Sequence, residues 1–487
     1  MFLGIDIGTS GVKAVAMTAD GVVAETATTA LAISRPNENW SEQDPSDWWR
    51  ATQDTILKLS AKTRSAIQGV GLSGQMHGAT FLERDGRVLR PAILWNDGRS
   101  VTEGRDLQTR YPAFLEKTGN LVMPGFTAPK VEWVRRHEPD IFGKIDKVLL
   151  PKDYVRYRLC GDFASDMSDS AGTLWLDVGK RAWAEDLLAA CGLNLSQMPR
   201  LYEGVEQTGQ MRVDVAQSLG MKPTPIVAGG GDNAAGAVAV GAVDAGQSLL
   251  SLGTSGVIFT ATETYRANPA SAVHSFCHAL PERWHLMSVI LSAASCLEWG
   301  RRITGNQSVT EFIRPAETRA PTDTTPIFLP YLSGERTPHN NPHARGAFFG
   351  LSHDTGPAQI AQAIMEGVAF ALADGVDALS AADAHIDALT VIGGGAQSAH
   401  WGKVLAAALG KRLIYRDGAD VGPALGAARL AAYGVLGGDM ADTFAPPPVL
   451  REIEPDPTLS NHYAEKRAQF AALYRTLKPL FDGASYA

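Results

Sequence analysis

Cysteine and long apolar runs are scarce in this sequence, and both shortages limit what the protein can be. Its 487 residues include four cysteines, and no two of them form a CxxC pair. Scattered cysteines in a long chain are typical of reduced thiols, so we expect a cytoplasmic protein without a paired-cysteine zinc site. No apolar run approaches the ~20 residues of a membrane span. The start, MFLGIDIG, lacks the basic residues of a signal peptide.

Positive charge is also in deficit, with 44 Lys and Arg residues against 52 Asp and Glu and a net charge of −8. This balance argues against electrostatic binding to nucleic acid or to an anionic membrane surface. The apolar share of 45% and the charged share of 20% are ordinary for a globular enzyme. A chain of this length is too long for one core, so we expect two or three domains. A phosphate-bearing ligand would have to be held by local donors and a metal ion.

One short pattern occurs twice, half a chain apart. Gly4–Val15 reads GIDIGTSGVKAV and Leu249–Thr260 reads LLSLGTSGVIFT. Apolar residues on both sides of a Gly-Thr-Ser-Gly turn predict a tight hairpin between two strands. Such a turn offers backbone N–H groups and hydroxyls to a phosphate, and the turn residues are Gly8, Thr9, Ser10, Gly253, Thr254 and Ser255. The repeat predicts two related domains facing one polyphosphate, although two ordinary glycine-rich hairpins would read the same.

The two copies differ where Asp6 of the first aligns with Ser251 of the second. A carboxylate beside a phosphate cradle repels the phosphate unless a cation lies between them. Mg²⁺ suits this place, because it usually keeps several waters and takes few protein ligands. We therefore predict that Asp6 is a metal-binding residue.

Strand-like and helix-like segments alternate along the chain. Strands are predicted at 2–7, 12–17, 69–72, 148–150, 226–228, 248–252, 257–261 and 389–392, and helices at 45–59, 127–137, 358–382 and 461–481. This alternation predicts an α/β fold with mixed sheets. A loop is expected at Pro446–Pro448, directly before the last helix. The clearest domain boundary lies near Gly241–Gly246, which divides the chain into residues 1–244 and 245–487.

An acidic residue follows a glycine run in Ile226–Ala237, which reads IVAGGGDNAAGA. The glycines allow a sharp bend that brings Asp232 and Asn233 to the end of a strand, where ligands collect in α/β sheets. Asp232 can accept a proton there. The alternative is that Asp232 caps the following helix.

Two further segments follow predicted strands. Leu389–Ala396, LTVIGGGA, could admit adenine or a phosphate at Gly393, Gly394, Gly395 and Ala396, or could be a simple strand-to-helix turn. In QMHG, Met76 and His77 could contact a substrate hydroxyl or belong to the core. Four charged residues are expected to be solvated in loops, namely Arg99, Lys152, Glu335 and Arg336. Four tryptophans could be platforms for a sugar, but such residues more often belong to the core: Trp40, Trp48, Trp49 and Trp95.

Taken together, these motifs resemble the FGGY carbohydrate kinases. Gly125–His137, GFTAPKVEWVRRH, is similar to the first signature of that family, and Gly346–Glu366, GAFFGLSHDTGPAQIAQAIME, fits the second. The resemblance runs from Met1 to about Arg429 and is weaker beyond. Within the family, the segments SGQMHGA, RPAILWNDGR, LLPKDY, SDMSDSAGTLWLD, GGGDNAAGA and YLSGERTPHNNP are similar to the branch that acts on D-xylulose. Glycerol kinases carry an Arg-Glu pair near QMHG, which disfavours glycerol.

The resemblance implies a fold and a reaction. The fold is two ribonuclease-H-like domains of the actin/hexokinase/Hsp70 superfamily, flanking a central cleft. The reaction is ATP-dependent phosphorylation of D-xylulose to D-xylulose 5-phosphate. It further implies that Mg-ATP lies against the two Gly-Thr-Ser turns with Asp6 near the metal, and that Gly393–Ala396 borders the adenosine. Met76, His77, Asp232 and Asn233 would hold the ketose, with Asp232 as general base. A homodimer is the family expectation.

Other functions remain open at this point. Another sugar or polyol kinase of the same family would act on D-ribulose or xylitol. An actin-like chaperone or filament ATPase would use the same cleft without a sugar. A non-catalytic sugar sensor would be expected to lose Asp6 or Asp232, and both acids are present.

Overall fold

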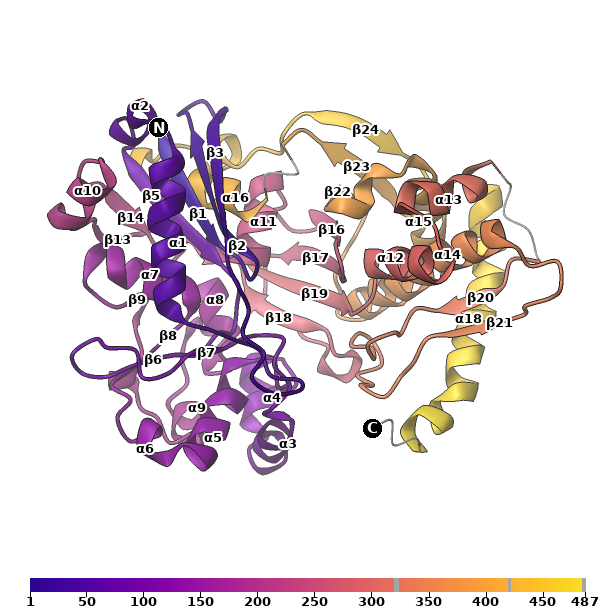
Figure 1. Cartoon of the computed structure of the whole chain (residues 1–487), viewed down its shortest axis with the longest axis horizontal. Coiled ribbons are helices and arrows are strands. Elements are labelled where there is room, and N and C mark those ends of the chain that lie inside the picture. The colour runs from indigo at the N-terminus through magenta and orange to yellow at the C-terminus, as the bar shows by residue number, and fades with distance from the viewer. Residues whose placement is uncertain (319–323, 419–421, 484–487) are drawn as a thin grey trace.

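The computed structural model describes residues 1–318, 324–418 and 422–483, and within them the chain builds two seven-stranded sheets. The first sheet lies in the indigo-to-magenta half of Figure 1 and the second in the pink-to-yellow half, with helices around each. Among the described residues, no helix combines the length and the apolar character that crossing a membrane requires.

The first sheet is built around the first copy of the repeat. Its strand order is β13-β14-β5-β1-β2-β3, with β15 also pairing to β5. β1 runs antiparallel to β2, with Ile7 opposite Val12, and parallel to β5, with Asp6 opposite Ser73. The strands are β1 Phe2–Ile7, β2 Gly11–Met17, β3 Val23–Ala30, β5 Gly69–Gly74, β13 Gln207–Gln210, β14 Pro225–Val227 and β15 Gly230–Gly231.

The second sheet repeats this arrangement around the second copy. Its strand order is β18-β19-β17-β16-β22-β23-β24. β16 runs antiparallel to β17, with Leu252 opposite Gly256, and parallel to β22. The strands are β16 Ser248–Leu252, β17 Gly256–Thr262, β18 His274–Cys277, β19 Trp284–Ile290, β22 Ala388–Ile392, β23 Arg412–Arg416 and β24 Val449–Ile453. In each sheet the strand before the glycine turn pairs antiparallel with the next strand and parallel with a later one: β1 with β2 and β5, and β16 with β17 and β22. The prediction of related mixed-sheet domains is confirmed.

One helix of the second half packs on the first sheet. α16, Pro423–Leu436, lies across β1 and β5 and against α11, Asp232–Val240. A Cβ at Gly4 would lie 1.8 Å from Ala424 O, and one at Gly71 would lie 2.0 Å from Ala427 O. Glycine is required there because α16 approaches the strands backbone to backbone. The first sheet therefore depends on residues beyond 244, and the division at 244/245 stays a prediction.

A buried cluster on the side of β17–β19 also joins the two halves. It contains Phe81 and Trp175 of the first half together with Phe259, Phe276 and Met287 of the second. Burying several aromatic side chains at such a junction contributes roughly 1.5–3 kcal/mol each. The two halves therefore share a core on the side of β17–β19.

The remaining elements surround this framework. Before the second sheet they are β4 Glu42–Gln43, α1 Pro45–Lys58, α2 Ala61–Ser65, β6 Thr80–Leu82, β7 Ala92–Ile93, α3 Val101–Arg110, α4 Ala113–Thr118, α5 Thr127–His137, α6 Pro139–Phe142, β8 Lys147–Leu149, α7 Pro151–Cys160, β9 Ala164–Asp166, α8 Met167–Ala171, β10 Leu176–Asp177, β11 Ala182–Trp183, α9 Glu185–Ala190, η1 Leu195–Gln197, β12 Arg200–Tyr202 and α10 Val213–Leu219. Later in the chain they are η2 Pro269–Ser271, α12 Ala294–Ile303, α13 Val309–Glu317, β20 Ile327–Leu329, β21 Ala347–Phe349, α14 Pro357–Ser380, η3 Gly394–Gln397, α15 Ala399–Leu409, α17 Met440–Thr443 and α18 Pro457–Gly483.

Most predicted elements are present within one to four residues of their expected bounds, and α5 matches exactly at both ends. Several strands were not predicted, among them β3, β19, β23 and β24. β24 stands between the expected loop at Pro446–Pro448 and α18, so the loop does not lead directly into the last helix. β24 is an edge strand that is largely exposed. An exposed edge strand has no buried face to impose a period-two apolar pattern, so its sequence carries little strand signal.

Candidate active site

The first predicted phosphate turn joins β1 to β2. Gly8 N donates to Gly11 O at 3.0 Å, which closes the turn. The Thr9 hydroxyl donates to Gln75 Oε1 at 2.9 Å, whereas Ser10 is exposed. Because the Thr9 hydroxyl is engaged within the protein, the turn offers its backbone N–H groups and the Ser10 hydroxyl to a ligand.

Three glycines carry the chain from β14 across the end of β5 to Asp232. A Cβ at Gly229, whose φ is +83°, would lie 1.8 Å from Leu72 O, and one at Gly231 would lie 3.1 Å from Met76 Cγ. Only glycine allows this crossing. Asp232 is the first residue of α11, and the N-cap of that helix is Gly231. The alternative role of Asp232 as the helix cap is therefore wrong. The crossing brings Gly231, the residue before Asp232, against Met76.

The carboxylates of Asp6 and Asp232 lie close enough to interact. Burial, and then the charge of Asp232, raise the pKa of Asp6 to about 7. Burial also raises the pKa of Asp232 to about 6, although Asn233 N and Nδ2 donate to its Oδ1 at 2.7 and 2.8 Å. Asp6 Oδ1 is buried and has no hydrogen-bond partner in the described part of the chain. An unpartnered carboxylate oxygen beside a second carboxylate fits a hard divalent cation, which would offset the repulsion.

His77 is fixed in a defined orientation. Its φ is +70°, and its backbone oxygen accepts hydrogen bonds from Lys130 Nζ at 2.9 Å and Thr127 Oγ1 at 3.2 Å. Its Nδ1 lies 2.8 Å from Gly172 O, so Nδ1 carries the proton and Nε2 is an acceptor. Burial, together with the charges of Lys130 and Arg336, lowers the pKa of His77 to about 3. The ring is therefore neutral at pH 7.

A small cavity of about 40 Å³ lies beside this ring. It is lined by His77, Trp95, Met123, Gly125, Phe126 and Arg336. Trp95 is 40% exposed, and its Nε1 donates to Thr9 Oγ1 at 3.0 Å. That bond connects the cavity to the first phosphate turn. Trp48, by contrast, is fully buried in the core, as expected.

The second phosphate turn is tied to the start of α12. Gly253 N donates to Ser255 O at 3.0 Å. Thr254 O accepts from Ala293 N at 2.9 Å and from Ser295 Oγ at 2.8 Å. This places the N-terminus of a ten-residue helix at the turn. A helix N-terminus favours anions, and the sequence analysis missed it because α12 carries no cap signature.

The glycine run after β22 folds over the end of β16. A Cβ at Gly393 would lie 2.7 Å from Leu252 O, and one at Gly395 would lie 2.9 Å from Leu252 Cβ. Gly394 faces open space, and Ala396 belongs to η3. Since Leu252 directly precedes the second phosphate turn, the run and the turn are neighbours.

The predicted site residues thus fall into two groups. The first turn, Asp6, Met76, His77, Asp232 and Asn233 form one group, and the second turn with the Gly393–Ala396 run forms the other. Among the described residues, no hydrogen bond or ion pair joins one group to the other. That one ATP spans both groups stays a prediction.

A buried ion cluster under Asp232 escaped the sequence analysis. The Lys152 ammonium is fully buried and lies within 3.6 Å of three buried carboxylates, those of Asp153, Asp166 and Asp169. Burial alone lowers the pKa of Lys152, but the three carboxylates raise it overall. Ser168 Oγ donates to Asp166 Oδ2 and accepts from Gly231 N at 3.1 Å. The cluster therefore supports the residue that precedes Asp232.

The expectation that four charged residues are solvated was wrong. Arg99 is 1% exposed at its side chain and pairs with Asp97 and Glu42, each at 2.7 Å. Lys152 belongs to α7 and is buried, Glu335 is 2% exposed, and Arg336 lines the cavity. Charged side chains become buried when partners far away in sequence surround them, and a single sequence does not reveal those partners. For Lys152, the acidic residues of the segments PKDY and SDMSDS were the available indication that carboxylates could surround the ammonium group.

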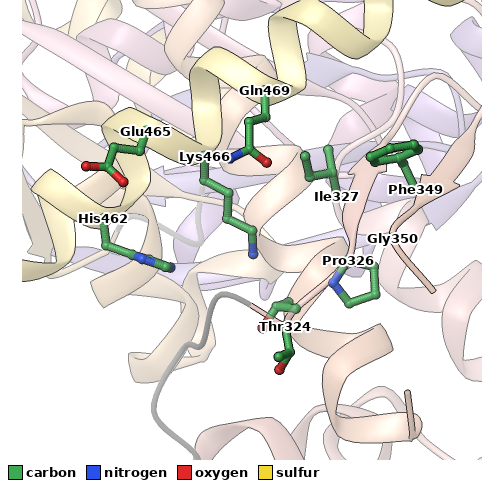
Figure 2. A pocket seen from close by; sticks show the side chains of 10 residues that line it. Thr324, Pro326, Ile327, Phe349, Gly350, His462, Glu465, Lys466 and Gln469 are labelled. Carbon is green, nitrogen blue, oxygen red and sulfur yellow. The ribbon is translucent and has the colours of Figure 1, made fainter. Parts of the chain in front are cut away.

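Figure 2 shows another cavity, of about 260 Å³, between α18 and the strands β20 and β21. Its Lys466 pairs with the buried carboxylate of Glu366, which is the last residue of the second signature. None of its lining residues belongs to the predicted site. We therefore do not place the reaction there.

Two sheets of related topology, each carrying one of the predicted phosphate turns, with the buried acids Asp6 and Asp232 at the first of them, fit a two-domain sugar kinase architecture. Residues 1–239 match the N-terminal domain of the FGGY family of carbohydrate kinases, and residues 249–435 match its C-terminal domain. The chain belongs to this family, whose members have the actin/hexokinase-like fold.

Individual relatives cover nearly the whole chain. It is 54% identical to the xylulose kinase of Escherichia coli (strain K12), over 99% of this chain and 100% of that protein. It is 35% identical to the xylulose kinase of Bacillus subtilis (strain 168), over 89% and 88%. The crystal structure of a xyloylose kinase from Brucella ovis has a TM-score of 0.96 and 48% identity, covering 98% of this chain and 99% of that one.

Proposed function

We propose that this protein transfers the γ-phosphoryl group of ATP to the terminal hydroxyl of D-xylulose, releasing D-xylulose 5-phosphate and ADP. The relatives named xylulose kinase support this substrate. The observation that carries the proposal is the three-glycine crossing, which sets Gly231 against Met76 and so starts α11 with Asp232 beside the residue that precedes His77 in the chain. An actin-like ATPase without a sugar would have no use for that arrangement.

Asp232 acts as the general base. Both bonds from Asn233 are made to Oδ1, so Oδ2 is the oxygen that we assign as proton acceptor. With a pKa of about 6, the carboxylate is mostly ionised at neutral pH. The sugar O5–H bond breaks as O5 bonds to the γ-phosphorus, the proton moves to Asp232, and ADP leaves with the electrons of the broken P–O bond. Because the transition state of phosphoryl transfer is loose, alignment matters more than a strong base.

Met76, His77, Asp232 and Asn233 form the ketose site. The neutral His77 ring accepts a hydrogen bond from a sugar hydroxyl at Nε2, since Nδ1 donates to Gly172 O. The Asn233 amide holds the carboxylate of Asp232 in place. Met76 supplies the apolar wall between His77 and Gly231.

The two phosphate turns and the glycine run hold the nucleotide. Within the turns Gly8–Ser10 and Gly253–Ser255, the backbone N–H groups of Thr9, Ser10, Thr254 and Ser255 bind the phosphates, helped by the N-terminus of α12, since those of Gly8 and Gly253 close the turns themselves. Gly393–Ala396 borders the adenosine, because glycine backbone admits a flat ring. Asp6 would hold Mg²⁺, since its buried Oδ1 has no hydrogen-bond partner among the described residues. When bound, the ion neutralises charge on the phosphates.

We also propose that the protein is a cytoplasmic homodimer. The four cysteines are free thiols, which suits a reducing compartment. The dimer rests on the family resemblance and is testable by light scattering.

A coupled assay of ADP release tests the substrate. We expect D-xylulose to give the highest kcat/KM in a panel that also contains D-ribulose, xylitol, glycerol and aldoses. Faster turnover of D-ribulose or xylitol would show that the assigned substrate is wrong, but the protein would still be a sugar kinase. ADP release that does not depend on any sugar would support the ATPase alternative.

His77→Ala is expected to lower kcat/KM for D-xylulose by about 10²-fold or more. The loss of Nε2 leaves a substrate hydroxyl unpaired in a dry site, and such unpaired groups discriminate strongly. The measurement compares this loss with sugar-independent ATP hydrolysis on the same preparation, which should change little. Equal losses in both would place His77 in the nucleotide site or in the core.

A further inference from the structure

We propose that Arg336, from the second half of the chain, binds the ketone end of the sugar, opposite the hydroxyl that is phosphorylated. This inference rests on the proposed function and adds to it a residue that recognises the substrate. It follows from four observations on the loop that carries Arg336, the cavity, the pairing of the guanidinium and the position of Asp232.

The loop that carries Arg336 is anchored on both sides of it. Thr337 N donates to Val289 O at 3.0 Å, and Thr337 Oγ1 accepts from Val289 N at 3.1 Å and donates to Ala272 O at 2.9 Å. Glu335 Oε1 accepts from Leu291 N at 3.0 Å. These contacts fix the loop to the edge of the second sheet, close to the core that both halves share. Arg336 is therefore held against the first half without any ligand.

The cavity at Arg336 is the right size for one end of a ketopentose. Its volume of about 40 Å³ exceeds the ~30 Å³ share of a water molecule in the liquid. It has room for a hydroxymethyl group. Every lining residue except Arg336 comes from the first half. A sugar end in this cavity would contact both halves of the chain.

Arg336 differs from the other buried arginines in its pairing. Arg99 and Arg181 each pair with carboxylates. In the described residues, no carboxylate lies within ion-pair distance of Arg336, and its one side-chain hydrogen bond is from Nη1 to His274 Nε2 at 3.3 Å. Burial raises the pKa of its neighbour Glu335 to about 8, so this carboxyl group does not cancel the charge. A guanidinium has five N–H donors, so most of its donors remain for a ligand.

The donors and acceptors of the cavity match the end of a ketose. His77 Nε2 accepts a hydrogen bond, and Arg336 donates. The group –CO–CH₂OH offers a hydroxyl that donates and a carbonyl oxygen that only accepts. Asp232, the proposed base for the phosphorylated hydroxyl, does not line this cavity. We therefore assign O1 to His77 and O2 to Arg336.

Arg336→Met is expected to raise KM for D-xylulose about ten- to a hundredfold, the usual worth of a hydrogen bond to a charged group. Arg336→Lys should restore part of the loss. The matched control is Arg181→Met, because Arg181 also joins the two halves through the backbone oxygen of Arg283 but lies outside the cavity. Calorimetry with D-xylulose alone measures sugar affinity, and ADP binding shows that each variant is folded.

An unchanged KM in a variant that still binds ADP would overturn the assignment. An equal rise of KM in Arg181→Met would overturn it too, since the effect would then come from the contact between the halves. If the wild-type protein phosphorylates a different ketose and ignores D-xylulose, the proposed function fails while Arg336 is still tested on that ketose. Xylitol carries a hydroxyl at C2 where D-xylulose carries a ketone. If Arg336→Met weakens the binding of both compounds equally, Arg336 contacts O2 in either form, and the contact stands.

Discussion

Asp232→Asn is expected to lower the rate of phosphoryl transfer to D-xylulose by about 10²- to 10⁴-fold, the usual cost of losing a general base. The amide keeps the shape of the carboxylate and its bond to Asn233, but it cannot take up the proton of the attacking hydroxyl. Single-turnover transfer from ATP measures the chemical step directly. Near-normal transfer in this variant would contradict the assignment of Asp232 as base.

Two further measurements sharpen this result. Because burial raises the pKa of Asp232 to about 6, the wild-type rate should fall as the pH drops through that value, when the base becomes protonated. The residual rate of the variant should lack that fall. Asp374→Asn is the matched control, since Asp374 is largely buried and pairs with Arg467 in the second half, away from the site. We expect it to leave the transfer rate within about twofold.

Asp6→Asn is expected to raise the Mg²⁺ concentration needed for half-maximal activity at least tenfold and to lower kcat. Asp6 has the one unpartnered carboxylate oxygen in the first hairpin, and an amide binds a hard cation far more weakly. Titration of activity with Mg²⁺ at fixed ATP gives the result. An unchanged Mg²⁺ dependence in this variant would show that Asp6 does not bind the metal.

Ser251→Ala is the control for Asp6→Asn. Ser251 occupies the equivalent position of the second hairpin, opposite Val257 as Asp6 is opposite Lys13. It has no charge to offer a cation. We expect the Mg²⁺ dependence of Ser251→Ala to equal that of the wild-type protein, which separates a loss of metal binding from a general disturbance of a hairpin.

The sequence by itself determined the parts whose signal is local. The GTSGV repeat predicted two hairpins, because glycine turns between apolar runs need no distant partner to be read. The run GGGDN predicted a bend that ends in an acid, and Gly229 is indeed a position where a Cβ would clash. The family signatures then predicted the reaction class, which the relatives bear out.

Only the tertiary structure decided how distant segments meet. Nothing in Pro423–Leu436 indicates that it packs on the first sheet, since that contact depends on Gly4 and Gly71 some 350 to 420 residues earlier. The tertiary structure also decided which charged side chains are removed from solvent. Lys152 and Arg336 belong to polar stretches that read as solvated. Lys152 is buried because Asp166 and Asp169 surround it, and Arg336 is partly buried because it lines a cavity between the two halves. A charged side chain is stable in such a place only through partners that folding supplies, so its role cannot be read from its neighbours in sequence.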